Sequence, residues 1–554
     1  MRRNLEALSR AEFDLAVIGG GVNGAATARE AALRGLKVAL IEGHDFASGT
    51  SSRSSKLIHG GLRYLKQREF HLVRESRRER RLLLKLAPHL AQPLPFLLPI
   101  YRGDPYAPVE IRAGLTIYDW LGNLGRGDRH HFYRPAETLH RLPSLRGEGL
   151  RASAVYHDSL TDDARLTLEY VLDAAAHGAV VANYAEVRAF SIAPGRPAIA
   201  HAEVADRLTG GRCEVAARFW INATGPWVDR VRKIIAGYDG SRTIRTTKGV
   251  HLILPSISET YAVFAAIRPG ERIFVIMPWH GIALLGTTDT EYDGDLENVE
   301  PDEGDIEYLL GAVNRVLREP FNRSDVLGSF AGLRPLVAEE GKEPSEITRD
   351  YRFHRDPWAE NLITVCGGKL TTARALGEKL LDLIVAALPA GTVRAAAYSD
   401  PSRSAPVPGG HIMDYPCFVK EAREQAARTF GVSPETAERI ARTYGSRWRS
   451  VLAPIRKDRS LGESLTEAGG LTRAEAVFSI REEMAMTIGD FLLRRSGLNW
   501  VVQTHSGAGK AAANVFAREL GWSDEARRAA ILEYARLAGC STKPASPATG
   551  SRQS

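Results

Sequence analysis

The sequence has few cysteines, and they form no recognisable group. Cys213, Cys366, Cys417 and Cys540 are spread over 554 residues, with no CxxC pair and no cluster of cysteine with histidine. This spacing argues against a disulfide framework and against a zinc site. We therefore expect a protein of a reducing compartment, with no bound metal.

Long apolar segments are also missing. No run reaches the ~18 apolar residues that a membrane-spanning helix needs. The most apolar stretch, residues 86–101, is interrupted by four prolines. The first apolar run, residues 13–18, contains Asp14 and leads directly into glycines, unlike the core of a signal peptide. Any membrane contact is therefore expected to be peripheral.

The charge balance is only mildly basic. Lys and Arg number 73 against 66 Asp and Glu, which gives a net charge of +7, and 44% of the residues are hydrophobic. This ordinary composition excludes a disordered or collagen-like chain. Basic residues do not cluster with aromatic ones, so no nucleic-acid partner is expected. The positive charge fits an anionic ligand or a membrane surface.

Residues 12–42 predict a nucleotide-binding unit. A short apolar strand (13–18) leads into a G-x-G-x-x-G turn formed by Gly19, Gly21 and Gly24; an Ala-rich helix (25–33) and a strand ending at Glu42 follow. The glycines permit a tight turn, and the helix N-terminus attracts a pyrophosphate. Glu42 can accept hydrogen bonds from ribose hydroxyls. Its negative charge would repel the 2′-phosphate of NADP, so NADP is disfavoured. The spacing suits FAD and NAD equally, whereas the position at the start of a long chain favours FAD.

The rest of the pattern predicts three domains in an α/β (α+β overall) chain. Short strands between residues 179 and 285 suggest a sheet-based domain, and a Ser/Pro/Gly-rich linker at 399–410 precedes helical segments at 417–430, 434–444, 473–495 and 507–520. We expect a discontinuous cofactor domain (12–80, 155–230 and 345–392), a cap domain (81–154 and 231–344), a helical C-terminal domain (400–540) and a disordered tail (541–554).

Residues 50–65 closely resemble the flavin-contacting segment of the FAD-dependent (aerobic) glycerol-3-phosphate dehydrogenases. Segments at 222–228, 248–251, 286–289, 332–336, 347–351, 367–372, 481–485 and 490–495 resemble later parts of that family in the same order. The resemblance implies a Rossmann-like FAD-binding domain of the D-amino-acid-oxidase/glutathione-reductase type, with a β-sheet substrate cap and a helical C-terminal domain. The sequence departs from the family at Arg53, where small residues are usual, and at Cys366, where a larger apolar residue is usual.

The reaction implied by the resemblance oxidises the C2 hydroxyl of sn-glycerol 3-phosphate to dihydroxyacetone phosphate, with a hydride passing to flavin N5. A dianionic phosphate needs cationic donors, and the hydroxyl proton needs an acceptor. Arg63 and Arg334 are expected to hold the phosphate, with Tyr64 and Lys369 as further donors. The residues expected to act in catalysis are His59, His251, Arg334 and Lys369, and of the two histidines His59 is slightly preferred as the base.

The expected cofactor contacts combine the glycine turn with the segments that carry the resemblance. Thr371 or Thr372 is also expected to cap a helix at 373–388, whose N-terminus favours an anionic reduced flavin. The full set of expected contacts is Gly19, Gly21, Gly24, Glu42, Thr50, Ser51, Ser54, Ser55, Lys56, Ala223, Thr224, Gly225, Gly368, Leu370 and Thr371.

Quinone is the electron acceptor that the resemblance implies, in a cytoplasmic homodimer attached peripherally to the inner face of the cell membrane. The helix at 65–87 and the segment 93–101 are candidate membrane contacts. A glycerol-3-phosphate oxidase that passes electrons to oxygen is an alternative within the same family. A non-catalytic FAD-binding sensor is an alternative of a different class.

Overall fold

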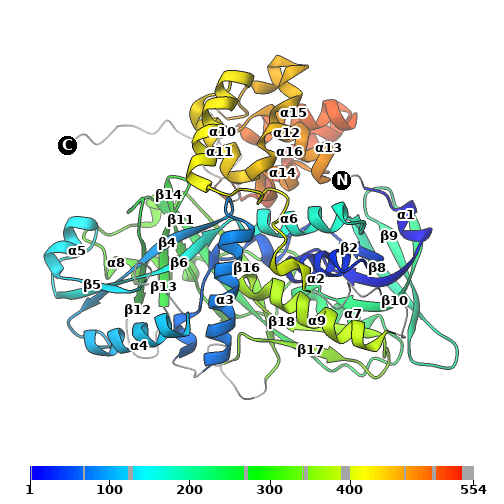
Figure 1. The fold of residues 1–554 in the computed structure, drawn as a ribbon, viewed down its shortest axis with the longest axis horizontal. Helices are drawn as coiled ribbons and strands as arrows, with labels where there is room; N and C mark the ends of the chain where they lie inside the picture. Colours follow the sequence, from blue (N-terminus) through cyan, green and yellow to red (C-terminus); the bar gives the residue numbers. More distant parts are fainter. Residues whose placement is uncertain are drawn as a thin grey trace.

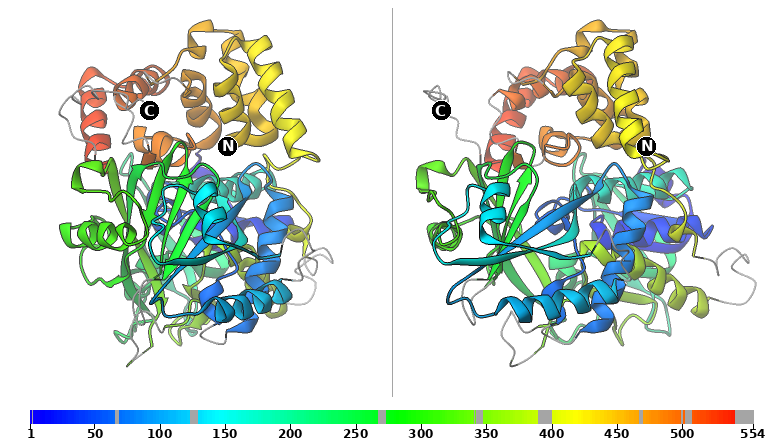
Figure 2. Two further views of the ribbon diagram at one scale, coloured as in Figure 1. Left: turned by 90° about the vertical axis from the view of Figure 1, so that its left-hand side faces the viewer. Right: turned by 60° about the vertical axis from the view of Figure 1, so that its left-hand side comes forward.

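The structure is a computed structural model of the chain. It describes residues 1, 3–65, 69–122, 129–266, 273–339, 341, 347–388, 400–466, 470–498, 500–501 and 507–539. Two mixed sheets lie side by side, and the helices between residues 415 and 537 lie across one end of both (Figures 1 and 2). The expected tail, 541–554, lies outside the described residues.

The first sheet has the strand arrangement of a dinucleotide-binding fold. Its order is β17–β18–β10–β1–β2–β7; the strands from β18 to β7 are parallel, and β17 is antiparallel at one edge. Antiparallel β8 and β9 extend β10. The bounds are β1 Glu12–Ile18, β2 Val38–Ile41, β7 Val180–Ala182, β8 Ala185–Ile192, β9 Ile199–Asp206, β10 Arg212–Asn222, β17 Tyr351–Arg355 and β18 Leu362–Gly367.

Helices cover one face of this sheet, as the continuous apolar composition of its central strands requires. All four residues of β2 are buried, and so are Leu15 and Val17 of β1. α2 (Val22–Leu33), α6 (Asp163–Ala176) and α9 (Ala373–Ala387) pack there in one apolar cluster. The other face is closed by a second cluster around Trp220 and the β8–β9 pair, with α1 (Glu6–Ser9) and α7 (Val228–Lys233) nearby.

The second sheet has the order β15–β11–β14–β13–β12–β4–β6–β3, with β16 paired to β11 and β5 to β6. β6 lies wholly in this sheet, so sheet membership changes after Thr161, whereas we expected the cofactor domain to resume at residue 155. The bounds are β3 Leu57–Ile58, β4 Ala91–Tyr101, β5 His131–Tyr133, β6 Leu150–Thr161, β11 Ile244–Pro255, β12 Ala262–Ala266, β13 Ile273–Trp279, β14 Ile282–Gly286, β15 Thr290–Glu291, β16 Gly328–Val337, α3 Phe70–Leu86, α4 Pro108–Leu121, α5 Pro135–Arg141 and α8 Glu303–Asn314.

Strand β4 corrects the expectation for the proline-rich segment 93–101. It pairs with β6 along its whole length, and Phe96, Leu97 and Leu98 are buried in the core. Pro93, Pro95 and Pro99 are tolerated because alternate residues of a strand direct their N–H groups to the same side, away from β6. This segment is therefore a core strand and not a membrane contact. Within the described residues, no helix is both long and apolar enough to cross a bilayer.

The helical domain contains one break that the sequence did not predict. The segment 473–495 forms two helices because Met484 takes a left-handed conformation (φ 53°) and Thr487 caps a new helix by accepting a hydrogen bond from the Asp490 N–H. The helix expected at residues 65–87 likewise begins only at Phe70. The bounds are α10 Tyr415–Phe430, α11 Pro434–Tyr444, α12 Trp448–Leu452, α13 Arg473–Glu483, α14 Ile488–Arg494, α15 Ala508–Leu520 and α16 Asp524–Leu537.

Buried ion pairs fix the helical domain to the first sheet. Asp45, which follows β2, accepts hydrogen bonds from Arg494 (2.5 Å) and Arg495 (2.7 Å). Burial alone would raise the pKa of Asp45, but the two guanidinium groups lower it to about 2. Arg165 of α6 likewise binds Glu483 at 2.7 Å. Removing one partner would leave a buried charge, so these pairs fix the orientation of the domain.

Candidate active site

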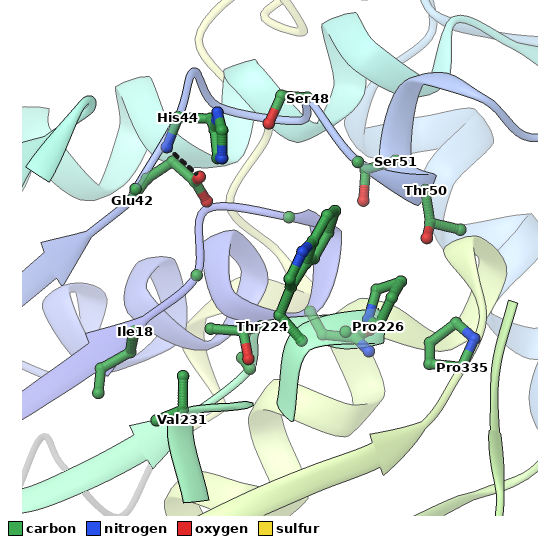
Figure 3. Close-up of a pocket in the computed structure, with 18 of the residues that line it drawn as sticks. Ile18, Glu42, His44, Ser48, Thr50, Ser51, Thr224, Pro226, Val231 and Pro335 are labelled. Atoms are coloured by element: carbon green, nitrogen blue, oxygen red, sulfur yellow. Dashed lines mark hydrogen bonds between the residues drawn. The ribbon is translucent and has the colours of Figure 1, made fainter. Parts of the chain in front are cut away.

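One cavity opens at the carboxyl ends of the parallel strands. β1, β2 and β10 end in register, with Ile18 beside both Ile41 and Asn222. The residues that follow, Gly19, Glu42 and Ala223, consequently meet at the edge where open α/β sheets bind their ligands. The cavity volume is about 370 Å³, within the range of ligand sites. Figure 3 shows Glu42 and His44 at one end of it, and Thr50 and Pro335 at the other.

The glycine turn leaves no space for side chains. Gly19 has φ +104°, and a Cβ atom there would lie 2.7 Å from the carbonyl oxygen of Ala223. A Cβ atom on Gly24 would lie 1.9 Å from the carbonyl oxygen of Gly19. α2 starts directly after Gly21, so its first N–H groups and its positive dipole end lie at the cavity, where the Val22 N–H donates to Ser51 Oγ at 2.9 Å. These residues therefore fit the pyrophosphate of a dinucleotide.

Glu42 is held on the cavity wall by backbone groups. Its carboxylate accepts hydrogen bonds from the N–H of Gly20 (2.6 Å) and from that of His44 (2.7 Å; Figure 3). Burial raises the pKa of Glu42, although both hydrogen bonds oppose this effect. Each oxygen of a carboxylate has a further lone pair. The fixed carboxylate is therefore able to accept ribose hydroxyl groups, as the sequence led us to expect.

Most of the expected cofactor contacts lie on the cavity wall, and some lie behind it. Those on the wall are Gly19, Gly21, Glu42, Thr50, Ser51, Ser54, Ala223, Thr224, Gly225, Gly368 and Leu370, together with Lys369. Those behind it are Gly24, Ser55, Lys56 and Thr371. Lys56 Nζ is buried against Asp163 Oδ1 at 2.6 Å. Direct contact of these four with the cofactor stays a prediction.

The start of α9 differs from what we expected. Thr372 is the N-cap residue, but its side chain makes no capping hydrogen bond within the described part of the chain. The hydroxyl of Thr371 instead accepts a hydrogen bond from the N–H of His59, at 3.2 Å. Thr371 therefore joins the start of α9 to the segment that carries the resemblance.

Several wall residues carried no recognisable signal in the sequence. They come from strand β8 and from single positions elsewhere, and only the fold brings them together: His44, Ser48, Glu186, Val187, Arg188, Arg207, Arg230 and Glu297. Cys366, one of the two departures from the family pattern, does not line the cavity. Its side chain packs with Val228, Ile244 and Val337, and burial raises its pKa to about 11. A direct effect of Cys366 on cofactor packing is therefore not expected.

Arg334 lies in β16 beside the cavity. Its guanidinium donates to Asp289 (3.2 Å) and Thr287 (2.9 Å), and it lies so close to Gly249 that a Cβ there would be 2.3 Å from Nη2. Arg349 binds the other oxygen of Asp289 at 2.9 Å. Arg334 keeps 27% of its side chain exposed. A fixed, partly exposed guanidinium of this kind suits a phosphate or carboxylate ligand.

Lys369 and Tyr64 form a second cationic site. Lys369 Nζ lies 3.8 Å from the centre of the Tyr64 ring, and it has no hydrogen-bond partner within the described residues. Burial lowers the pKa of Lys369. The ring of His59 lies 6.3 Å from that of Tyr64. The side chain of Arg63 lies outside the described residues, so its expected phosphate contact stays a prediction.

His251, the other candidate base, is fixed by contacts at one ring nitrogen and on one ring face. Its Nε2 lies 2.8 Å from Ser55 Oγ, and its ring stacks on Phe330 with centroids 4.9 Å apart. Burial, and after it the charges of Arg334 and Lys56, lower the pKa of His251 to about 3. The imidazole is therefore neutral at physiological pH, and one of its ring nitrogens carries a free lone pair.

The fold and this cavity define a flavoprotein oxidoreductase with a separate helical domain. The family described as FAD dependent oxidoreductase matches residues 14–383, and the C-terminal domain of alpha-glycerophosphate oxidase matches residues 401–527. A solved structure of a glycerol-3-phosphate dehydrogenase from Bacillus halodurans, complexed with FAD, has a TM-score of 0.77 and 29% identity, and the match covers 97% of each chain.

Curated relatives narrow this class further. The chain is 35% identical to a glycerol-3-phosphate dehydrogenase of Synechocystis sp., over 96% of this chain and 97% of the relative. It is 36% identical to the aerobic glycerol-3-phosphate dehydrogenase of Bacillus subtilis, over 90% of both. The chain therefore belongs to the FAD-dependent glycerol-3-phosphate dehydrogenase family. The family resemblance, the fold class and FAD as the cofactor are thereby confirmed.

Proposed function

We propose that this chain oxidises sn-glycerol 3-phosphate to dihydroxyacetone phosphate. The observation that carries the proposal is the pairing of two cationic sites with a buried neutral imidazole beside the cavity. Lys369 lines that cavity, and Arg334 directly precedes Pro335, which also lines it. His251 lies close enough to Arg334 that the guanidinium charge lowers the pKa of the imidazole. An amino-acid substrate does not call for two cations, whereas a phosphate dianion does.

Each side chain has one task in this reaction. Bound FAD supplies the two-electron acceptor for the hydride from C2. Arg334 holds the phosphate through its planar donors, and Lys369 adds a second cation. We assign His251 as the base that accepts the C2 hydroxyl proton, because Ser55 holds one nitrogen of its ring and Phe330 one face. This assignment reverses the slight preference for His59 in the sequence analysis.

Anaerobic titration of the flavin tests this function. Adding sn-glycerol 3-phosphate to the oxygen-free holoenzyme is expected to bleach the flavin absorbance, whereas glycine is expected to leave it unchanged. If no polyol phosphate reduces the flavin, the enzyme assignment fails and the non-catalytic sensor is favoured. His251→Gln is expected to slow the bleaching more than His59→Gln. The opposite order would return the base to His59.

Quinone as the electron acceptor is supported by the surface around α3 and α4. On α4, Val109 is 70% exposed, Ile117 45% and Trp120 78%, at spacings that place them on one face of the helix. α3 packs against α4 and exposes Arg74 and Arg78. An apolar helix face beside basic residues fits the surface of an anionic bilayer, where quinones dissolve. This surface replaces the segment 93–101 as the candidate membrane contact.

Vesicle binding tests this surface. The holoenzyme is expected to cosediment with vesicles that contain anionic lipid, and the double variant Ile117→Ser/Trp120→Ser is expected to bind at least about tenfold more weakly, because each large apolar side chain contributes about 1.5–3 kcal/mol when buried. Leu532→Ser, on exposed α16, is the matched control. If the α4 variant instead changes the sedimentation of the free protein, the face belongs to the expected homodimer.

The electron acceptor needs a separate measurement. If glycerol 3-phosphate oxidation in air produces stoichiometric peroxide, and adding quinone does not raise the rate, the chain is the oxidase.

A further inference from the structure

A residue of the helical domain reaches the site through a stack of three rings. Trp500 follows α14 and is 5% exposed. Its ring stacks on Phe330 of β16, with centroids 5.4 Å apart and planes at 15°. Phe330 stacks in turn on His251, with centroids 4.9 Å apart and planes at 12°. The helical domain, which the family comparison separates from the FAD-binding part, is thus connected to the imidazole through the Phe330 ring.

Trp500 also holds the segment that carries Ser55. Its Nε1–H donates to the carbonyl oxygen of Ser52 at 3.0 Å. The guanidinium of Arg53 lies over the Trp500 ring, 5.2 Å from its centre, and donates to the carbonyl oxygen of Ala331 at 3.3 Å. Arg53 is thereby half-buried. Its loss of solvation, together with the charge of Arg494, lowers its pKa to about 10. The bulky residue that departs from the family pattern is accommodated by this tryptophan.

The Trp500 indole contacts the residues that hold His251 in place: it stacks on Phe330 and binds the segment that carries Ser55. Phe330 supports the face of the imidazole, and Ser55, three residues after Ser52, bonds its Nε2. On β14, which pairs with β11, a Cβ atom on Gly286 would lie 2.3 Å from His251 Cδ2. The backbone of β14 therefore confines the imidazole ring as well. Removing the indole would free the Phe330 face and the Ser52 carbonyl together. No other contact of the helical domain described above reaches the imidazole.

We infer that Trp500 is a positioning residue for His251, through which the helical domain sets the geometry of the reacting site. The inference rests on the proposed function only in taking His251 as part of that site. A displaced general base lowers turnover, because catalysis depends on reacting atoms held within about 1 Å of their productive positions. Docking of the helical domain is consequently a condition for full activity.

Two substitutions at Trp500 and two at Trp448 test the inference in the holoenzyme. Trp448 is equally suited as a control because it is 2% exposed, belongs to the same domain and packs edge-on against Phe430. Trp500→Leu is expected to lower kcat per bound flavin by about ten- to a hundredfold with little change in KM, and Trp500→Phe, which keeps a ring, to recover most of it. Trp448→Leu and Trp448→Phe are expected to lower Tm without changing kcat per bound flavin.

Chemical labelling gives a readout that does not depend on activity. Diethyl pyrocarbonate modification at His251, measured by peptide mass spectrometry, is expected to be slow in the native enzyme and in both Trp448 variants, and faster in Trp500→Leu. Unchanged labelling and unchanged kcat per flavin in Trp500→Leu would overturn the inference. If that variant does not fold, Phe330→Leu removes the middle ring and must give both changes. Failure of the native enzyme to be reduced by glycerol 3-phosphate would refute the proposed function alone, since the labelling still decides the role of Trp500.

Discussion

Replacing Arg334 with alanine is expected to lower kcat/KM for sn-glycerol 3-phosphate by at least about tenfold. Loss of a charge-assisted hydrogen bond costs about 1.5–3 kcal/mol, which corresponds to that factor or more. The fold should survive, because Asp289 keeps Arg349 as its partner at 2.9 Å. Arg334→Lys is expected to recover only part of the loss, since an ammonium group cannot make the planar contact with two oxygens. Steady-state kinetics with an artificial electron acceptor measures both.

Arg245 provides the control for this substitution. It lies on the neighbouring strand β11, is 27% exposed like Arg334, and binds Glu291 at the surface. Arg245→Ala should leave kcat/KM unchanged. Unphosphorylated glycerol distinguishes two roles for Arg334: a phosphate ligand affects only glycerol 3-phosphate, mainly through KM, whereas a group that stabilises the C2 alkoxide affects kcat for both substrates equally. Equal decreases in kcat for the two substrates would show that Arg334 acts at the reacting carbon and does not bind the phosphate.

The parts of the site that are local in sequence could be predicted, because their chemistry is carried by neighbouring residues. The turn at Gly19, Gly21 and Gly24 lies within six positions, and Glu42 ends the next strand. Their arrangement around the ends of β1 and β2 follows from the parallel βαβ connection. The family resemblance extended the prediction of the site to segments as far as residue 372. Each segment is short, but their order along the chain is specific to the family.

Contacts between distant segments could not be predicted in this way. Lys56 binds Asp163, which lies 107 positions later in the chain, and no pattern in the sequence pointed to this pair. Trp500 is one of three tryptophans in the helical region, and its stack with Phe330 depends on the docking of a whole domain. The prolines of β4 were read as a break because only the strand register shows that their missing donors face away from β6.

The largest effect on the cofactor is expected from Gly24→Ala. A Cβ atom at this position would lie 1.9 Å from the carbonyl oxygen of Gly19, a backbone atom that cannot rotate away, so α2 must move off the turn by roughly 1 Å. That movement also displaces the N–H groups that face the pyrophosphate. We expect the variant to be purified with little or no FAD, and its Tm not to rise when FAD is added, whereas ligand binding to the native apoprotein raises its Tm. Gly311→Ala, in α8 with nothing within 4 Å of the new methyl group, is the control and should be neutral or stabilising by up to about 1 kcal/mol. A Gly24→Ala protein with a full complement of FAD and an unchanged Tm would show that the close contact between helix and turn is not what holds the cofactor.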